Sequence, residues 1–212
     1  MARYIKGILG PLQGTVGTVV GGSWNGIDYL RSRPKKSNRS ASKLQIIQRA
    51  KFALVGEFLK GIVALLALAF RDKRSGISDY NGAFRFVFEN ALTGNYPAFL
   101  IDYSKVLLTK GVLLNAGNPQ SGAEPGRVVK FTWTDNSGIA MANADDKCIL
   151  ILYCPELNRF LYTTDAGMRS DASATIDAAA FSGMTVETWI GFISDEEVNV
   201  ATSLYTGQVV VS

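Results

Sequence analysis

Apolar residues recur at helical spacing in the first half of the chain. Those between residues 44 and 58 lie three or four positions apart, which is the period of one face of an α-helix. Ser40 and Ser42 are suitable N-caps, so we predict a helix that begins after one of them. Its apolar face consists of Leu44, Ile47, Ala50, Leu54 and Phe58.

Two further helices are predicted after this one. Gly61 divides the first helix from an almost wholly apolar segment at 62–71, where basic residues and then Gly76 mark the end. A third amphipathic pattern covers 78–92 and ends before Gly94. The apolar run Ile62–Phe70 has nine residues, whereas a membrane span needs about 20, so we predict a buried helix and no membrane span.

From about residue 98 the pattern changes to strand-like alternation. The first such run is 99–108, and residues 115–126 are predicted to be a loop. Seven short runs separated by turn signals then follow at 127–134, 138–144, 147–154, 158–164, 172–177, 184–194 and 199–208. This spacing is typical of a β-sandwich of the immunoglobulin or fibronectin type III class, in which Trp133 and Trp189 would lie in the core.

Residues 5–30 are rich in glycine, with Gly7, Gly10, Gly14, Gly17 and Gly21 at helical spacing. Each glycine inside a helix costs about 1 kcal/mol relative to alanine, so extended structure with tight turns is favoured. Asn25-Gly26 is a typical hairpin turn, which places strands near 16–23 and 27–33. We expect four of the glycines to allow close chain packing: Gly14, Gly17, Gly21 and Gly22.

These patterns predict an α+β protein with two domains. Residues 1–97 would form a glycine-rich, basic module of a β-hairpin followed by helices. Residues 98–212 would form an all-β sandwich of the immunoglobulin or fibronectin type III kind.

Charge is divided unequally between the two halves of the chain. Residues 1–100 hold fifteen Lys/Arg and five Asp/Glu, whereas residues 101–212 hold seven and thirteen. Such asymmetry indicates a polyanionic partner or electrostatic head-to-tail assembly.

The basic charge is densest between Arg31 and Lys51, where eight Lys/Arg occur without an acidic residue, near Trp24, Tyr29 and Phe52. This segment could follow a phosphate backbone, bind the acidic surface of a neighbouring subunit, or form a solvated helix face. The candidate contact residues are Arg31, Arg33, Lys35, Lys36, Arg39 and Lys43.

Side chains that usually carry catalysis are scarce. Histidine is absent, which removes the commonest general base and a common metal ligand. Cys148 and Cys154 would share one face of a strand about 20 Å apart, too far for a disulfide, and are interpreted as buried apolar residues. The acidic groups Asp145-Asp146 and 195–197 are interpreted as solvated turns. No Gly-Lys-Ser/Thr phosphate loop occurs, and we predict no enzyme activity, metal or cofactor.

A resemblance covers nearly the whole chain. The segments 7–34, 48–59, 93–108 and 131–138, with Tyr-Thr-Thr-Asp-Ala-Gly from Tyr162 and Trp-Ile-Gly-Phe-Ile-Ser from Trp189, resemble a family of Bacteroidota proteins known only as a domain of unknown function. The basic stretch 33–52 is also similar to segments of small phage and prophage virion proteins. It has Ser37-Asn38-Arg39 where those segments have Asn-Pro.

We therefore expect a non-enzymatic structural protein, a subunit of a phage-like particle, tail or filament. Its partners would be copies of itself or other subunits, with nucleic acid as a further possibility. The alternatives are a monomeric nucleic-acid-binding protein, and an adhesin or carbohydrate-binding module that uses Trp133, Trp189 or Tyr162. No convincing signal peptide is present, so the expected location is cytoplasmic or particle-associated.

Overall fold

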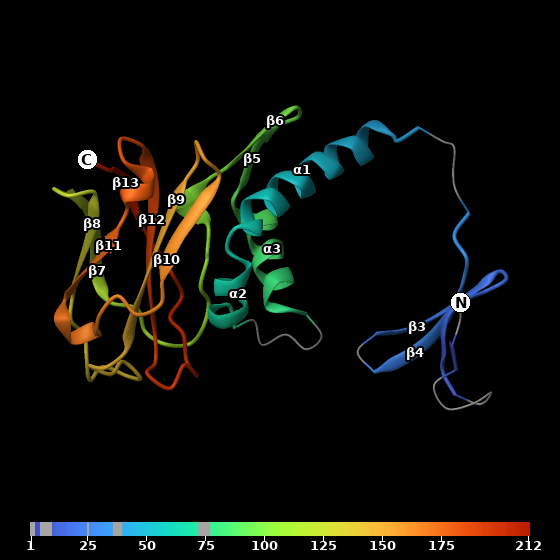
Figure 1. Ribbon diagram of the computed structural model, residues 1–212, viewed down its shortest axis with the longest axis horizontal. Coiled ribbons are helices and arrows are strands. Elements are labelled where there is room, and N and C mark those ends of the chain that lie inside the picture. The colour runs from blue at the N-terminus through green and yellow to red at the C-terminus, as the bar shows by residue number, and fades with distance from the viewer. Residues whose placement is uncertain (1–2, 5–9, 25, 36–39, 72–76) are drawn as a thin grey trace. The chain divides into compact units, whose positions relative to one another are not determined.

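The structure, a computed structural model, describes residues 3–4, 10–24, 26–35, 40–71 and 77–212 (Figure 1). It contains helices and several antiparallel sheets and is mostly β. The chain divides into two compact units, Met1–Ser42 and Lys43–Ser212.

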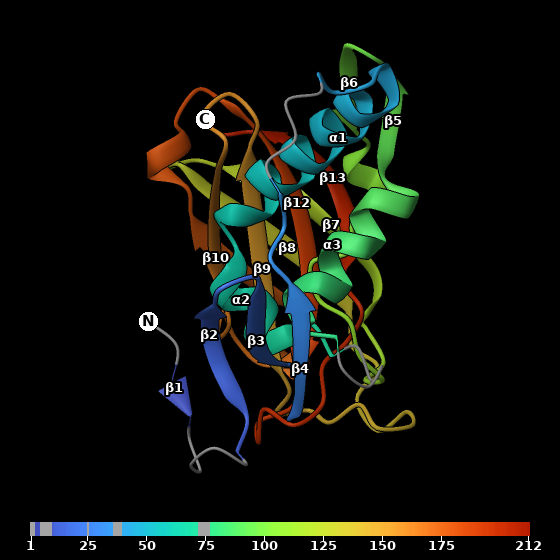
Figure 2. The same cartoon turned by 90° about the vertical axis from the view of Figure 1, so that its right-hand side faces the viewer.

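The first unit is a four-stranded antiparallel sheet, which we call the arm sheet (Figure 2). Its strands, in spatial order, are β1 (Arg3–Tyr4), β2 (Leu12–Val16), β3 (Val19–Trp24) and β4 (Ile27–Ser32). The predicted hairpin is confirmed, because Trp24 pairs with Ile27 and Gly26 has a positive φ of 79°. Asn25 lies outside the described residues. The strand β2, which pairs with β3, was not predicted as a separate element.

The second unit begins with three helices, as predicted. They are α1 (Lys43–Lys60), α2 (Val63–Ala69) and α3 (Asp79–Asn90). Ser78 caps α3, because its hydroxyl accepts a hydrogen bond from the Asn81 backbone N–H at 3.3 Å. Among the described residues, no single helix is long and apolar enough to cross a membrane, although α1 and α2, bent by 80° at their junction, reach that limit as a pair.

Two sheets and a hairpin complete the second unit. The hairpin consists of β5 (Leu92–Asn95) and β6 (Ala98–Ile101). A three-stranded sheet has the order β11 (Ser173–Asp177), β8 (Val128–Thr134), β7 (Gly117–Glu124). A four-stranded sheet has the order β10 (Arg159–Thr163), β9 (Lys147–Cys154), β12 (Thr185–Ile193), β13 (Leu204–Val210). Single turns of 3-10 helix occur at Tyr103–Lys105, Arg169–Asp171 and Ala179–Phe181.

Two of the predictions for this half of the chain are wrong, and two are right only in part, since the run 99–108 is a strand only to Ile101 and the run 199–208 only from Leu204. The expected loop 115–126 contains β7, an edge strand with few branched residues that is held by its pairing with β8. The expected strand 138–144 is a turn: Gly138 and Ala140 both have positive φ, and the Gly138 N–H donates to the Ala142 carbonyl at 2.8 Å. The alternating apolar residues of that segment therefore do not form a ladder.

The four-stranded sheet lies between the three-stranded sheet and the helices (Figure 1). The second unit accordingly has two hydrophobic cores, one on each face of this sheet. Cys148, Leu150 and Leu152 of β9 face the three-stranded sheet. Ile149, Ile151 and Tyr153, on the other face of β9, pack with the helices. Because β9 is buried on both faces, its sequence is a nearly continuous apolar run, whereas β12, which is also buried, includes Glu187 and Thr188.

The hydrophobic pattern placed a domain boundary between residues 97 and 98, whereas the contacts divide the chain between Ser42 and Lys43. The helices share their core with β9 and β12, so residues 43–97 pack in the same compact unit as the strands. A change from helical to strand-like periodicity marks a change of secondary structure and does not by itself mark the end of a core.

Candidate interaction surface

The strand register of the arm sheet assigns its side chains to two faces. Directly paired residues of an antiparallel sheet lie on the same face, and neighbours along a strand alternate. The pairs of β3 with β4 put Trp24, Ile27, Tyr29 and Arg31 on one side, which we call the aromatic face. The pairs of β2, β3 and β4 put Leu12, Gly14, Val16, Val19, Gly21, Asp28 and Leu30 on the opposite side, the glycine face.

Within the first unit, no other layer covers either face of the arm sheet. Among the described residues of the first unit, only Gly21 is buried. Trp24 is 64% exposed, and Ile27 and Leu30 are each 65% exposed. A sheet ordinarily buries at least one apolar face against another layer, and the first unit supplies no such layer for the arm sheet.

The four predicted close-packing glycines all lie within the arm sheet: Gly14, Gly17, Gly21 and Gly22. Gly14 and Gly21 are directly paired, and a methyl group added at Gly21 would collide with the Leu12 carbonyl oxygen. A methyl group at Gly22 would lie 3.1 Å from the Tyr29 hydroxyl oxygen. Gly17 connects β2 to β3 with a positive φ of 55°.

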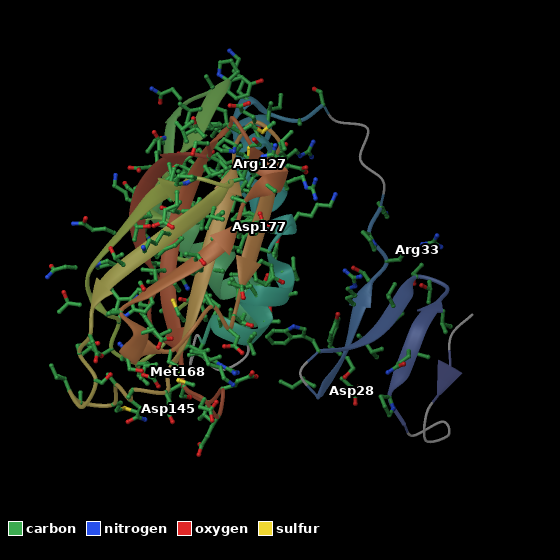
Figure 3. All side chains as sticks on the ribbon, turned by 60° about the vertical axis from the view of Figure 1, so that its left-hand side comes forward. Asp28, Arg33, Arg127, Asp145, Met168 and Asp177 are labelled. Atoms are coloured by element: carbon green, nitrogen blue, oxygen red, sulfur yellow. The ribbon has the colours of Figure 1, made fainter. Side chains whose placement is uncertain are left out.

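The predicted basic cluster is divided between the two units. Arg31 is on β4, and Arg33 and Lys35 follow it; all three are exposed. Figure 3 labels Arg33 beside the arm sheet. Lys43 is exposed and is the first residue of α1, in the second unit. Lys36 and Arg39 lie outside the described residues. Phe52 packs on α3, with ring centroids 5.2 Å from Phe84 and 4.9 Å from Phe88.

The second unit carries an acidic surface at one end of its sheets. The loops that follow β8, β10 and β12 meet there, because β9 begins beside the ends of β10 and β12. Asp145 and Met168 mark this end and Arg127 the opposite one (Figure 3). The exposed carboxylates of these loops, which we call the acidic end, belong to Asp135, Asp145, Asp165, Asp171, Asp195, Glu196 and Glu197. The hydroxyl and backbone N–H of Ser137 donate to Asp135 and lower the pKa of its carboxyl.

The prediction of a solvated turn is wrong for Asp146, which is fully buried. Its Oδ2 lies 2.9 Å from Nε of Arg169, and both side chains are inaccessible to solvent. The Arg169 guanidinium also donates to Asn136 Oδ1 at 2.7 Å and to the Leu114 carbonyl at 2.9 Å. Sequence reasoning missed this pair, since nothing in the loop sequences joins residues 23 positions apart. The pair fixes the loops that present the acidic end.

The remaining candidates are core residues. Trp133 is 6% exposed and donates from Nε1 to the Arg169 carbonyl at 2.9 Å, and Trp189 is fully buried. Neither ring therefore offers a free stacking face. Cys148 and Cys154 are free and buried, as predicted, and burial raises the pKa of the Cys148 thiol. No group of three or more metal-ligating side chains occurs among the described residues.

Comparisons with known proteins were made over the whole sequence. No curated protein and no solved structure matches the chain. The profile of a family of unknown function, DUF6266, matches residues 11–207. Because this match covers most of the 212 residues, the chain belongs to the family DUF6266, whose function is unknown.

Proposed function

We propose that this chain is a non-enzymatic structural subunit that assembles with copies of itself through the arm sheet, as part of a phage-like particle, tail or filament. The observation that carries the proposal is the exposure of both faces of the arm sheet, in which Gly21 is the one buried position among the described residues. A second copy would supply the missing layer.

The apolar side chains of the arm sheet provide the driving force. Burying one such side chain contributes about 1.5–3 kcal/mol relative to leaving it exposed. Trp24 and Ile27, which share the aromatic face, would therefore contribute at least about 3 kcal/mol to association when a second copy covers that face, a factor of about 100 in affinity.

Opposite charges support contacts between copies. Residues 1–42 contain seven Lys/Arg and one acidic residue, Asp28. The acidic end of the second unit presents seven exposed carboxylates, and the nearby Lys147 is bonded to one of them, at 2.9 Å from Asp195 Oδ1. Arg31, Arg33 and Lys35 of one copy would bind the acidic end of another and accelerate its encounter.

The strand order supports a finer fold assignment for the two sheets formed by β7 to β13. Counted in chain order from β7, the second, first and fifth strands form one sheet, and the fourth strand, β10, joins the sheet of β9, β12 and β13. In an immunoglobulin constant domain the fourth strand pairs with the fifth. We accordingly propose the fibronectin type III variant of the sandwich, with helices covering one sheet.

A second candidate function rests on the aromatic face. Trp24, Tyr29 and Arg31 lie on this one side of the arm sheet. Exposed aromatic rings with an adjacent guanidinium are the usual platform for stacking single-stranded nucleic acid. A high ratio of absorbance at 260 nm to 280 nm in the purified protein, with binding that weakens steeply as salt rises, would favour this function.

A triple substitution tests the proposed assembly. Trp24→Ser, Ile27→Ser and Leu30→Ser remove exposed apolar groups without creating a cavity in either core. We expect association to weaken at least about 100-fold, measured by sedimentation velocity over a range of concentrations.

The matched control changes three equally exposed residues of the second unit. Tyr96→Ser, Leu100→Ser and Val210→Ser alter side chains outside the acidic end that are 50%, 67% and 59% exposed. The control should assemble like the unchanged protein. Equal assembly by the arm variant and the unchanged protein would contradict the proposal.

A further inference from the structure

The strand β4 is an open edge of the arm sheet. The sheet ends with β4 in the order β1-β2-β3-β4, and all six residues of the strand are exposed. An exposed edge strand that contains Ile27, Tyr29 and Leu30 is a template for pairing with another chain.

The hydrogen bonds of the arm sheet identify the free backbone groups of β4. The Arg33 N–H donates to the Thr18 carbonyl at 2.7 Å, and these two residues are the next pair of the β3–β4 ladder after Val19 and Ser32. Hydrogen-bonded pairs alternate along an antiparallel ladder. Residues 27, 29 and 31 therefore bond to β3, while the N–H and C=O groups of Asp28, Leu30 and Ser32 point away from it.

We infer that two copies of the chain join along these free edges, as an antiparallel pair of β4 strands related by a two-fold axis at Leu30. This inference rests on the proposed assembly through the arm sheet and specifies one of its contacts. Leu30 would lie opposite Leu30 of the second copy, and Asp28 opposite Ser32. This register uses all three outward-facing residues and forms about six backbone hydrogen bonds.

The side chains of β4 fit this register. Tyr29 would lie opposite Arg31 of the second copy, in a non-hydrogen-bonded pair with Cα atoms about 4.5 Å apart. An arginine beside a tyrosine ring contributes about 0.5–1 kcal/mol at an exposed site. Asp28 would accept a hydrogen bond from the Ser32 hydroxyl, and no two like charges would be directly opposite.

The next symmetric register is less favourable. A two-fold axis at Tyr29 would pair Asp28 with Leu30 and leave Ser32 opposite Gly26, which lies in the turn. About four backbone hydrogen bonds would form in place of six. Hence the register at Leu30 is the one that the edge supports best.

A cysteine at position 30 tests the pairing directly. In the full-length protein, Leu30→Cys would bring two thiols into a pair whose Cα atoms are about 5.5 Å apart, within reach of a disulfide. Ile27→Cys is the matched control, because Ile27 and Leu30 are both 65% exposed. Its two copies would be about 20 Å apart. The native Cys148 and Cys154 are buried and do not compete.

With a mild oxidant, we expect Leu30→Cys to give a covalent dimer on a non-reducing gel and Ile27→Cys to give at least about tenfold less. Crosslinking of Ile27→Cys or Tyr29→Cys in preference to Leu30→Cys would overturn the inferred register. Hydrogen exchange on the unsubstituted protein provides a second measurement. The amides of Asp28, Leu30 and Ser32 should exchange at least about tenfold more slowly in the assembly than in the dilute chain.

The outcomes separate this inference from the proposed function. If the unsubstituted protein assembles but Leu30→Cys does not crosslink and the three amides exchange rapidly, the β4 pairing is wrong and assembly through the arm faces stands. If the protein remains a single chain at all concentrations, both are wrong.

Discussion

Replacing Arg169 by methionine is expected to lower the free energy of unfolding of the second unit by about 3–5 kcal/mol. The substitution removes the only cation paired with the buried carboxylate of Asp146 among the described residues. It also removes the donors to Asn136 Oδ1 and to the Leu114 carbonyl. Urea denaturation, followed by circular dichroism at one fixed protein concentration, measures the loss.

The control for Arg169 is the exposed ion pair at the same end of the sheets. Lys147 and Asp195 are 2.9 Å apart, with side chains 30% and 60% exposed. Water screens this pair, so Lys147→Met should cost no more than about 1 kcal/mol. Equal effects of the two substitutions would show that the Arg169–Asp146 pair does not hold the loops together.

Phe58→Ala is expected to lower the free energy of unfolding by about 3–5 kcal/mol and to do so in a single cooperative transition. Phe58 lies on α1, and its ring centroid is 4.9 Å from that of Tyr153 and 5.2 Å from that of Phe160. The helices and the four-stranded sheet share this core, so the substitution should destabilise both together. The circular dichroism signal of the helices and the tryptophan fluorescence should change at the same urea concentration.

Phe52→Ala, on the same helix, is the matched control for Phe58→Ala. Phe52 is 55% exposed, whereas Phe58 is 2% exposed. We expect Phe52→Ala to cost about 1 kcal/mol, since much of its ring already contacts water. If Phe58→Ala melts the helices at a lower urea concentration than the strands, residues 43–97 fold as a separate module.

Most elements of the second unit could be predicted from local sequence. The helical spacing from Leu44 to Phe58 and the N-cap signal before it place α1 correctly. The shared parity of Cys148 and Cys154 places both thiols on one face of β9, in the core between the sheets. The packing agrees with the local pattern for the two cysteines, whereas on α1 the expected apolar residue Leu44 is 75% exposed and the buried residues are Val55, Phe58 and Leu59.

The misassigned elements depend on distant partners. Strand β7 contains Gly117, Pro119 and Gly122, which are typical of loops, and it is a strand because β8 pairs with it. Segment 138–144 alternates like a strand, but the backbone at Gly138 and Ala140 has positive φ. The Arg169–Asp146 pair joins two loops that only the assembled sheets bring together.

The candidate surface was predicted in part. Arg31, Arg33 and Lys35 are exposed, and the glycines lie in extended strands and a turn. The sequence could not indicate that the arm sheet lacks a core, because exposure depends on which other layers pack against each strand. The sequence pattern around Trp24, Ile27 and Leu30 is equally consistent with buried and with exposed positions.

The molar mass of the full-length protein in solution tests the central claim most directly. One chain has a mass of 22.9 kDa. Light scattering at micromolar concentrations should give at least twice this value, and the mass should fall toward that of one chain on dilution or in the triple arm variant. A mass of one chain at every concentration, with and without the arm substitutions, would contradict assembly through the arm sheet.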